Sequence, residues 1–75
     1  MKTSRYTTLL IERKDQVTTV TFNRPDRKNA MNPQFHKEMG EALKIIEEDK
    51  ETRVLILTGA GDSFCAGQDL KEFFL

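Results

Sequence analysis

The stretch with the clearest chemical use in this sequence is 63–70, which reads Ser-Phe-Cys-Ala-Gly-Gln-Asp-Leu. It follows an apolar run, 54–57, and the Thr-Gly-Ala-Gly sequence of 58–61. This order is typical of a strand, a glycine-rich turn and the start of a helix. Because the first backbone N–H groups of a helix have no partner within it, those of 67–69 can point at an anion or a developing oxyanion.

Two other uses of these glycines fail on spacing. Residues 59–61 begin like the fingerprint of dinucleotide-binding proteins, but Phe64 stands where the last glycine is required. A Walker-type phosphate loop needs Gly-Lys-Ser or Gly-Lys-Thr, and the sequence contains neither. On the pattern alone, an ordinary strand-to-helix connection that uses its glycines for turning stays open.

Three residues with reactive side chains each have a structural explanation that we prefer. Asp69 suits a helix N-terminus, where the helix dipole favours a carboxylate. His36 falls in the first turn of a predicted helix beside Phe35, which favours a solvent-facing or packing role. Cys65 has no visible His or metal-ligand companion, so we expect it to pack in the interior. No metal site is predicted.

Two strands and a loop are the first elements that must position the strand-to-helix turn at 58–70. Two β-branched and aromatic runs, 8–13 and 17–22, flank the polar stretch 14–16 and predict a hairpin. The next ten residues, 23–32, are rich in Asn, Arg, Asp and Lys, and Pro25 has no N–H to donate to a strand. We expect a basic loop there.

A helix, a strand and a second helix complete the predicted order. Asn32 offers an N-cap, Pro33 suits the first helical position, and apolar residues recur at helical spacing as far as Glu48. These apolar residues are Phe35, Met39, Ala42, Leu43 and Ile46. The run 54–57 is apolar without alternation, which predicts a parallel strand buried on both faces. With a second helix beginning near Asp69, the predicted fold class is α/β.

The composition is that of a small protein that stays in water. Its 75 residues form one domain at most, and twelve basic residues balance twelve acidic ones, which gives no case for nucleic acid or a membrane surface as partner. No apolar run approaches the roughly 20 residues that span a bilayer. The one cysteine and the absence of an apolar signal core near the N-terminus predict a cytoplasmic location.

The last three residues, Phe-Phe-Leu at 73–75, are large and apolar. Such side chains need a packing partner, and a chain of this length offers only a marginal core. We expect residues 1–75 to be the N-terminal part of a larger polypeptide, so that the fold is incomplete as it stands.

From about Leu10 onward the sequence closely resembles the crotonase superfamily, the enoyl-CoA hydratase/isomerase enzymes. Four stretches carry the resemblance: the strand 17–22 with Asn-Arg-Pro after it, Asn-Ala-Met at 29–31, the run 54–61, and Phe-Cys-Ala-Gly-Gln-Asp-Leu at 64–70. It implies a crotonase-like α/β fold of ββα-type units: hairpin, helix, buried strand, oxyanion loop and helix. It also implies that 1–75 is the N-terminal part of a single such domain.

The resemblance further implies where the substrate sits. The backbone N–H of Gln68 would be one of two donors to the thioester carbonyl oxygen of an acyl-CoA. The resemblance implies that the main chain at Ala66 and Gln68 contacts coenzyme A and that Leu70 lies beside its channel. Arg27 is the best match for a contact with its phosphates, and Arg24 and Lys28 are the next candidates. Coenzyme A would enter as part of the substrate, with no permanently bound cofactor. Family members assemble as trimers or pairs of trimers, so a homo-oligomer is expected.

The implied function is that of an enoyl-CoA hydratase or isomerase acting on an acyl-CoA thioester. Because the acid/base carboxylates and the second oxyanion donor would lie beyond Leu75, residues 1–75 alone are expected to be inactive. An aromatic acyl-CoA hydratase/lyase or ring isomerase is the alternative, since 68–74 resembles those enzymes too. A non-catalytic acyl-CoA-binding fragment is the alternative of another class. A carboxylate facing Gln68 across a pocket would favour an enzyme over a binding role.

Overall fold

The computed structural model of this chain describes residues 2–3 and 5–74. The elements in chain order are strand β1 (Lys2–Thr3), strands β2 (Leu9–Lys14) and β3 (Val17–Phe22), the short 3-10 helix η1 (Pro25–Arg27), helix α1 (Pro33–Glu48), strand β4 (Val54–Gly59) and helix α2 (Leu70–Phe74). The predicted hairpin, both helices and the strand before the glycine-rich turn are confirmed. β1 is an element that the sequence did not predict.

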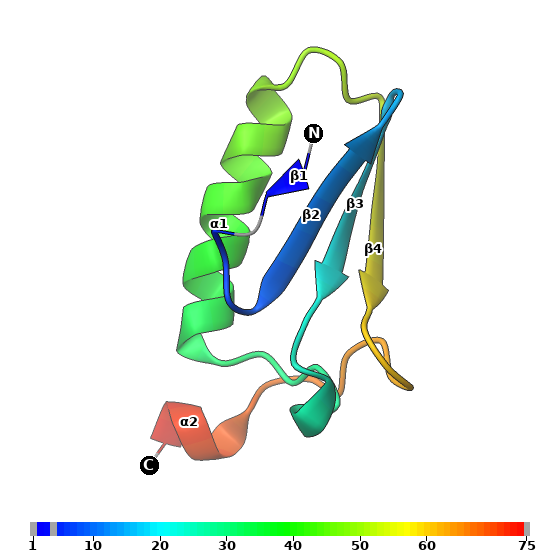
Figure 1. Cartoon of the computed structure of the whole chain (residues 1–75). Coiled ribbons are helices and arrows are strands. Elements are labelled where there is room, and N and C mark those ends of the chain that lie inside the picture. The colour runs from blue at the N-terminus through cyan, green and yellow to red at the C-terminus, as the bar shows by residue number, and fades with distance from the viewer. Residues whose placement is uncertain (1, 4, 75) are drawn as a thin grey trace.

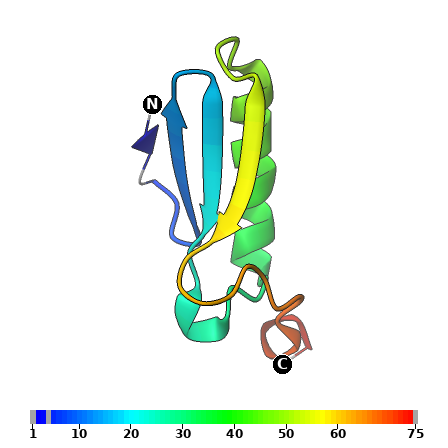
Figure 2. The same ribbon diagram turned by 90° about the vertical axis from the view of Figure 1, so that its right-hand side faces the viewer.

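The strands form one mixed sheet in the order β1-β2-β3-β4, and α1 runs along one face of it (Figure 1). β2 and β3 pair antiparallel, with Ile11 opposite Val20, whereas β4 pairs with β3 in parallel. Helix α1 supplies the crossover between the parallel strands. This connection brings the carboxyl ends of β3 and β4 to the same end of the sheet (Figure 2).

The core lies between the sheet and α1. Its strand residues, Leu9, Ile11, Val20 and Phe22, meet Phe35, Ala42 and Ile46 of the helix, with Tyr6 beside them. The ring of Phe22 packs edge-on against that of Phe35, with 4.8 Å between the ring centroids. As predicted, α1 begins after Asn32, whose side-chain oxygen accepts a hydrogen bond of 2.8 Å from the Phe35 N–H. This cap fixes where the helix starts relative to the loop before it.

The prediction that 54–57 is buried on both faces is wrong for this chain. The four side chains are between 39% and 50% exposed. The strand is parallel, as predicted, but it is the edge of the sheet, and among the described strands it pairs only with β3. The apolar composition of the strand therefore shows that both faces could be buried. Whether they are buried depends on what covers the strand.

The apolar stripe of α1 also differs from the prediction. Leu43 is exposed, and the inward position between Phe35 and Ala42 is taken by a carboxylate, Glu38. Glu38 accepts hydrogen bonds from the N–H and hydroxyl groups of both Thr7 and Thr8, and from the Gln34 amide. Burial opposes the ionisation of this carboxyl, but these bonds outweigh burial and lower its pKa to about 2.

Glu38 should therefore make the stability of the protein depend on pH in acid. Because its folded-state pKa is depressed, its contribution is complete above the ordinary carboxyl pKa and is lost as pH falls toward about 2. The depression corresponds to on the order of 3 kcal/mol of unfolding free energy at neutral pH. Urea unfolding of the wild type and of Glu38→Gln should differ by this amount at pH 7, and the difference should shrink as pH falls toward about 2. A difference that is constant with pH, or equal to that of the exposed control Glu41→Gln, would contradict this role.

Candidate functional site

Two loops meet at the carboxyl ends of β3 and β4, which is the end of a parallel pair where ligands commonly bind. The first, 23–32, leaves β3 and contains η1; the second, 60–69, leaves β4 and leads into α2 (Figure 1). Both lie at the same end of the sheet, together with α2 (Figure 2). Every residue that the sequence assigned to the site lies on one of these loops or at the start of α2.

Asn29 joins the two loops. Its side chain is buried, and its amide nitrogen donates to the carbonyl oxygens of Ala60 at 2.9 Å and Ser63 at 2.6 Å. Its amide oxygen accepts from the Arg24 N–H at 2.8 Å. Asn29 itself has a φ of 58°, in the left-handed region that asparagine tolerates better than most residues. One side chain therefore sets the separation of the loops.

Gly59, the last residue of β4, allows the second loop to fold back on the strand. A Cβ at this position would be closer to the carbonyl oxygens of Ser63 and Phe64 than Cβ atoms are found to approach, and 2.7 Å from the Asn29 amide nitrogen. Two of these obstacles are backbone atoms, which cannot rotate away. Glycine at 59 is thus a packing requirement of the loop.

Residues 66–69 run alongside 28–31 as a short parallel ladder. The Ala66 N–H donates to Lys28 O at 3.1 Å, Met31 N–H to Gly67 O at 2.7 Å, and Asp69 N–H to Met31 O at 2.8 Å. Met31 and Gln68 are thus opposite each other, and both of the bonds made by Met31 go to neighbours of Gln68. Among residues 2–3 and 5–74, no group accepts a hydrogen bond from the Gln68 N–H. This donor is directed away from the ladder and is available to a ligand.

Gly67, just before this donor, has a φ of 110°, which L-residues rarely adopt, and no atom lies within 4 Å of where its Cβ would be. The glycine therefore serves the backbone turn rather than close packing. Gln68, which follows this bend, is exposed.

The Gln68 side chain has a partner that the sequence did not indicate. Its Oε1 lies 2.9 Å from Nε2 of His36, on the first turn of α1. The His36 ring also packs edge-on against Phe35. The predicted solvent-facing and packing role of His36 is confirmed, and in addition it contacts the residue that presents the free N–H. Only the tertiary structure brings these two residues together, because 32 positions separate them.

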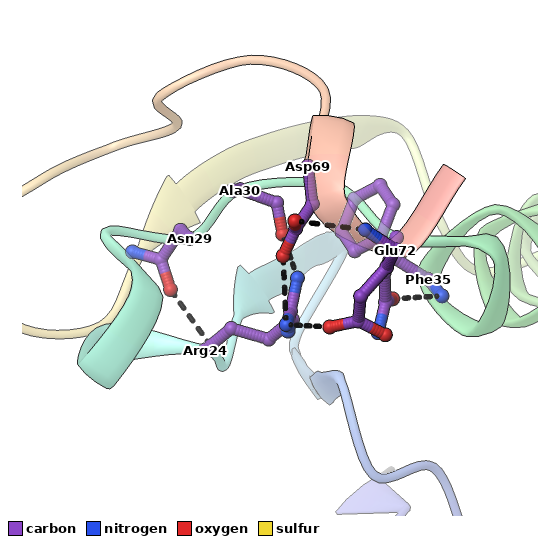
Figure 3. Close-up of polar contacts among 7 residues, drawn as sticks. Arg24, Asn29, Ala30, Phe35, Asp69 and Glu72 are labelled. Atoms are coloured by element: carbon purple, nitrogen blue, oxygen red, sulfur yellow. Dashed lines mark hydrogen bonds and ion pairs between the residues drawn. The ribbon is translucent and has the colours of Figure 1, made fainter. Parts of the chain in front are cut away.

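Asp69 caps α2, as predicted. Its Oδ1 accepts from the Glu72 N–H at 3.3 Å, and its Oδ2 lies 3.3 Å from Nη2 of Arg24 (Figure 3). Burial opposes the charge on Asp69, but the Glu72 N–H and the Arg24 guanidinium together hold the pKa of this carboxyl below its ordinary value. Asp69 is therefore an ionised structural carboxylate.

The predicted coenzyme A residues divide into two groups. Arg27, Lys28, Ala66 and Leu70 are exposed around the two loops, where a ligand could reach them. The Arg24 side chain is instead 11% exposed and already bonded to Asp69, to Glu72 at 2.7 Å and to the Ala30 carbonyl. A contact between Arg24 and a phosphate would have to displace these partners, so Arg27 and Lys28 are the better candidates.

Three further observations bear on other kinds of site. Within the described part of the chain, no three His, Cys, Asp or Glu side chains gather closely enough to hold a metal ion. Cys65, which was expected in the interior, is only partly buried and packs against the core. A search of the described residues found no helix with the length and apolar character needed to cross a membrane.

Comparison with known proteins places this chain in a family. Residues 12–74 match the family described as Enoyl-CoA hydratase/isomerase. The chain is 44% identical over 70 residues to a hydroxycinnamoyl-CoA hydratase-lyase of Pseudomonas fluorescens, covering 93% of this chain and 25% of the relative. It is 52% identical over 56 residues to the 1,2-epoxyphenylacetyl-CoA isomerase of Escherichia coli K12, covering 75% and 21%.

Solved structures agree. An enoyl-CoA hydratase of Mycobacterium tuberculosis H37Rv superposes with a TM-score of 0.83 at 44% identity, over 88% of this chain and 30% of that one. An enoyl-CoA hydratase/isomerase of Mycobacterium paratuberculosis gives 0.84 at 35% identity. The chain spans about a quarter of the length of the relatives that it matches. The partial fold is crotonase-like, and the chain belongs to the enoyl-CoA hydratase/isomerase family.

Proposed function

We propose that the protein acts on an acyl-CoA thioester as a hydratase or isomerase, and that the Gln68 N–H is one donor of its oxyanion hole. The observation that carries this proposal is the free N–H of Gln68, flanked by the bonded N–H of Asp69 and the turn at Gly67. Hydration or deprotonation next to a thioester builds negative charge on the carbonyl oxygen. A donor held in place before the reaction lowers the free energy of that charged state.

The exposed residues around the loops are suited to the rest of the substrate. Arg27 and Lys28 offer positive charge toward the nucleotide phosphates, and the arginine fork can bond two phosphate oxygens at once. Ala66 and Leu70 border the Gln68 donor with small or apolar surface. The carboxylates nearest to Gln68 in sequence, Asp69 and Glu72, are engaged by Arg24. The proton-carrying groups of the reaction are therefore not assigned to these residues.

Arg27→Ala should raise KM for acyl-CoA substrates by about tenfold while kcat changes little, because a phosphate contact far from the reacting carbon is made equally in the ground and transition states. Steady-state kinetics with crotonyl-CoA gives both constants. Asp26→Ala, an exposed neighbour on the same short helix, is the matched control. If KM for Arg27→Ala equals that of the wild type, Arg27 is a surface residue without a role in binding.

The proposal is tested by an intact mass followed by an activity assay. The mass in solution establishes which polypeptide carries these residues, and hydration of crotonyl-CoA by that polypeptide tests the reaction. Hydration of crotonyl-CoA at a rate that saturates with substrate concentration supports the proposal. Binding of crotonyl-CoA, measured by calorimetry, without turnover would favour a non-catalytic binding role. The absence of both binding and turnover would refute the proposed function.

An aromatic acyl group is the second candidate substrate. It is favoured by the two relatives named for hydroxycinnamoyl-CoA and epoxyphenylacetyl-CoA, at 44% and 52% identity. Comparison of kcat/KM for feruloyl-CoA and crotonyl-CoA decides between the two, and release of an aldehyde would identify a lyase.

We further propose a cytoplasmic homo-oligomer, a trimer or a pair of trimers. One cysteine fits a reducing compartment, and the exposed apolar side chains of β4 are the kind of surface that association buries. Light scattering after size exclusion measures the assembly, and a monomer at micromolar concentration would rule it out.

A further inference from the structure

We propose that Arg24 is a positioning residue: together with Asp69 and Glu72 it forms a clamp that holds the Gln68 N–H in place. This inference rests on the proposed function of that N–H. The clamp is defined by the Arg24 guanidinium, the two carboxylates and the Ala30 carbonyl, which are shown together in Figure 3.

The contacts of Arg24 reach both sides of the ladder that carries Gln68. Nη1 donates to the carbonyl oxygen of Ala30, the residue before Met31. Nη2 lies 3.3 Å from Oδ2 of Asp69, the residue after Gln68. One planar group thus bridges the first loop and the second at the position where the free N–H is presented. Separation of the loops would break the contact with Asp69, whereas the contact with Ala30 lies within the first loop.

The clamp is itself anchored at three places. The Arg24 backbone N–H is held by Asn29, so the origin of the side chain is fixed relative to the second loop. Glu72, on α2, accepts two hydrogen bonds. One carboxylate oxygen accepts from Arg24 Nη2 at 2.7 Å, and the other accepts from the Asn32 side-chain amide at 3.1 Å. Asn32 is also the N-cap of α1. The guanidinium therefore links the start of α1, the start of α2 and both loops.

The chemistry of the clamp calls for arginine. Its donors must reach a carbonyl oxygen and two carboxylates in different directions, and the guanidinium presents five N–H bonds in a fixed plane. A lysine ammonium in the same place is a single point and cannot reach the same acceptors at once. The buried, neutralised position of Arg24 differs from that of Arg27, which is exposed and available to a ligand.

Amide hydrogen exchange tests the clamp without relying on activity. In Arg24→Gln and Arg24→Lys, protection of the Met31 and Asp69 amides, which form the ladder bonds, should fall by about ten- to a hundredfold, the factor expected for hydrogen bonds to a charged group. Protection of the Val20 amide in β3 should stay within twofold of the wild type. Arg27→Gln, which removes an exposed positive charge from the same loop, should leave all three amides unchanged.

Two exchange results would overturn the clamp. Unchanged protection at Met31 and Asp69 would mean that Arg24 does not hold the ladder. An equal fall at Val20 would mean that Arg24 supports the whole fold rather than the loops. Asp69→Asn, which removes the charge but keeps the shape, should reproduce the loss in part, and combining it with Arg24→Gln should add less than the sum of the two.

Kinetics connects the clamp to the proposed function. If the loops position the donor, Arg24→Gln should lower kcat for crotonyl-CoA by about tenfold or more with little change in KM, since the donor acts mainly in the transition state. A rise in KM with kcat unchanged would instead make Arg24 a substrate-binding residue and overturn the proposal. If the wild type shows no turnover, the proposed function fails, while the exchange result still decides whether Arg24 holds the ladder.

Discussion

Gln68→Pro should reduce kcat for crotonyl-CoA by about 10²- to 10³-fold, the effect of removing one oxyanion donor, whereas Gln68→Ala should keep most of the activity. Proline has no N–H, and alanine retains it. The Gln68 N–H makes no hydrogen bond to another described residue, so its loss breaks no bond of the ladder to 28–31. The two variants thus distinguish the contribution of the main-chain N–H to activity from that of the side chain.

The structure adds a control to this comparison. Gln68→Ala also removes the contact with His36, so His36→Ala should show the same small effect if that contact serves the side chain alone. Equal losses in Gln68→Pro and Gln68→Ala would contradict a main-chain role. Because a proline ring can disturb the turn at Gly67, replacing the amide of residue 68 by an ester through semisynthesis provides a second test, which deletes the N–H and keeps the chain shape.

A large effect on the folded state is also expected from Gly59→Ala. A methyl group at 59 meets two backbone carbonyl oxygens and the Asn29 amide, so the loop 60–69 must move away from β4. Overpacking of this kind costs about 1 to 3 kcal/mol of unfolding free energy, or more where backbone must shift. The loss should be accompanied by faster amide exchange at Met31 and Asp69, because Asn29 can no longer hold both loops.

Gly40→Ala is the matched control for this substitution. Gly40 lies in the middle of α1, and no atom lies within 4 Å of where its Cβ would be. Alanine there should raise the unfolding free energy by about 0.5 to 1 kcal/mol, since glycine is the poorer helix former. Urea unfolding of both variants gives the comparison. A Gly59→Ala protein as stable as the wild type would mean that the loop does not require its close approach to β4.

The structure assigns different roles to the basic residues of the loop 23–29. The family resemblance of its sequence, Asn-Arg-Pro-Asp-Arg-Lys-Asn over 23–29, implied a phosphate contact for Arg27 and, with less support, for Arg24 and Lys28. The fold separates them: Arg24 turns inward to two carboxylates, whereas Arg27 and Lys28 are exposed. The sequence could not make this distinction, because the partners Asp69 and Glu72 are 45 and 48 positions away.

Apart from β1, local rules in the sequence determined the main strands and helices and their order. Alternation and β-branching specified the hairpin, the Asn32 cap and Pro33 specified the start of α1, and Gly67 allowed the turn beside Gln68, because each depends on neighbours in the chain. What only the tertiary structure decided depends on distant neighbours: the bonds of Asn29 between the loops, the His36 contact with Gln68, the inward turn of Arg24, and the exposure of β4. Hydrogen-bond partners and burial are set by which surfaces meet in space, and a run such as 54–57 has the same composition whether or not its faces are covered.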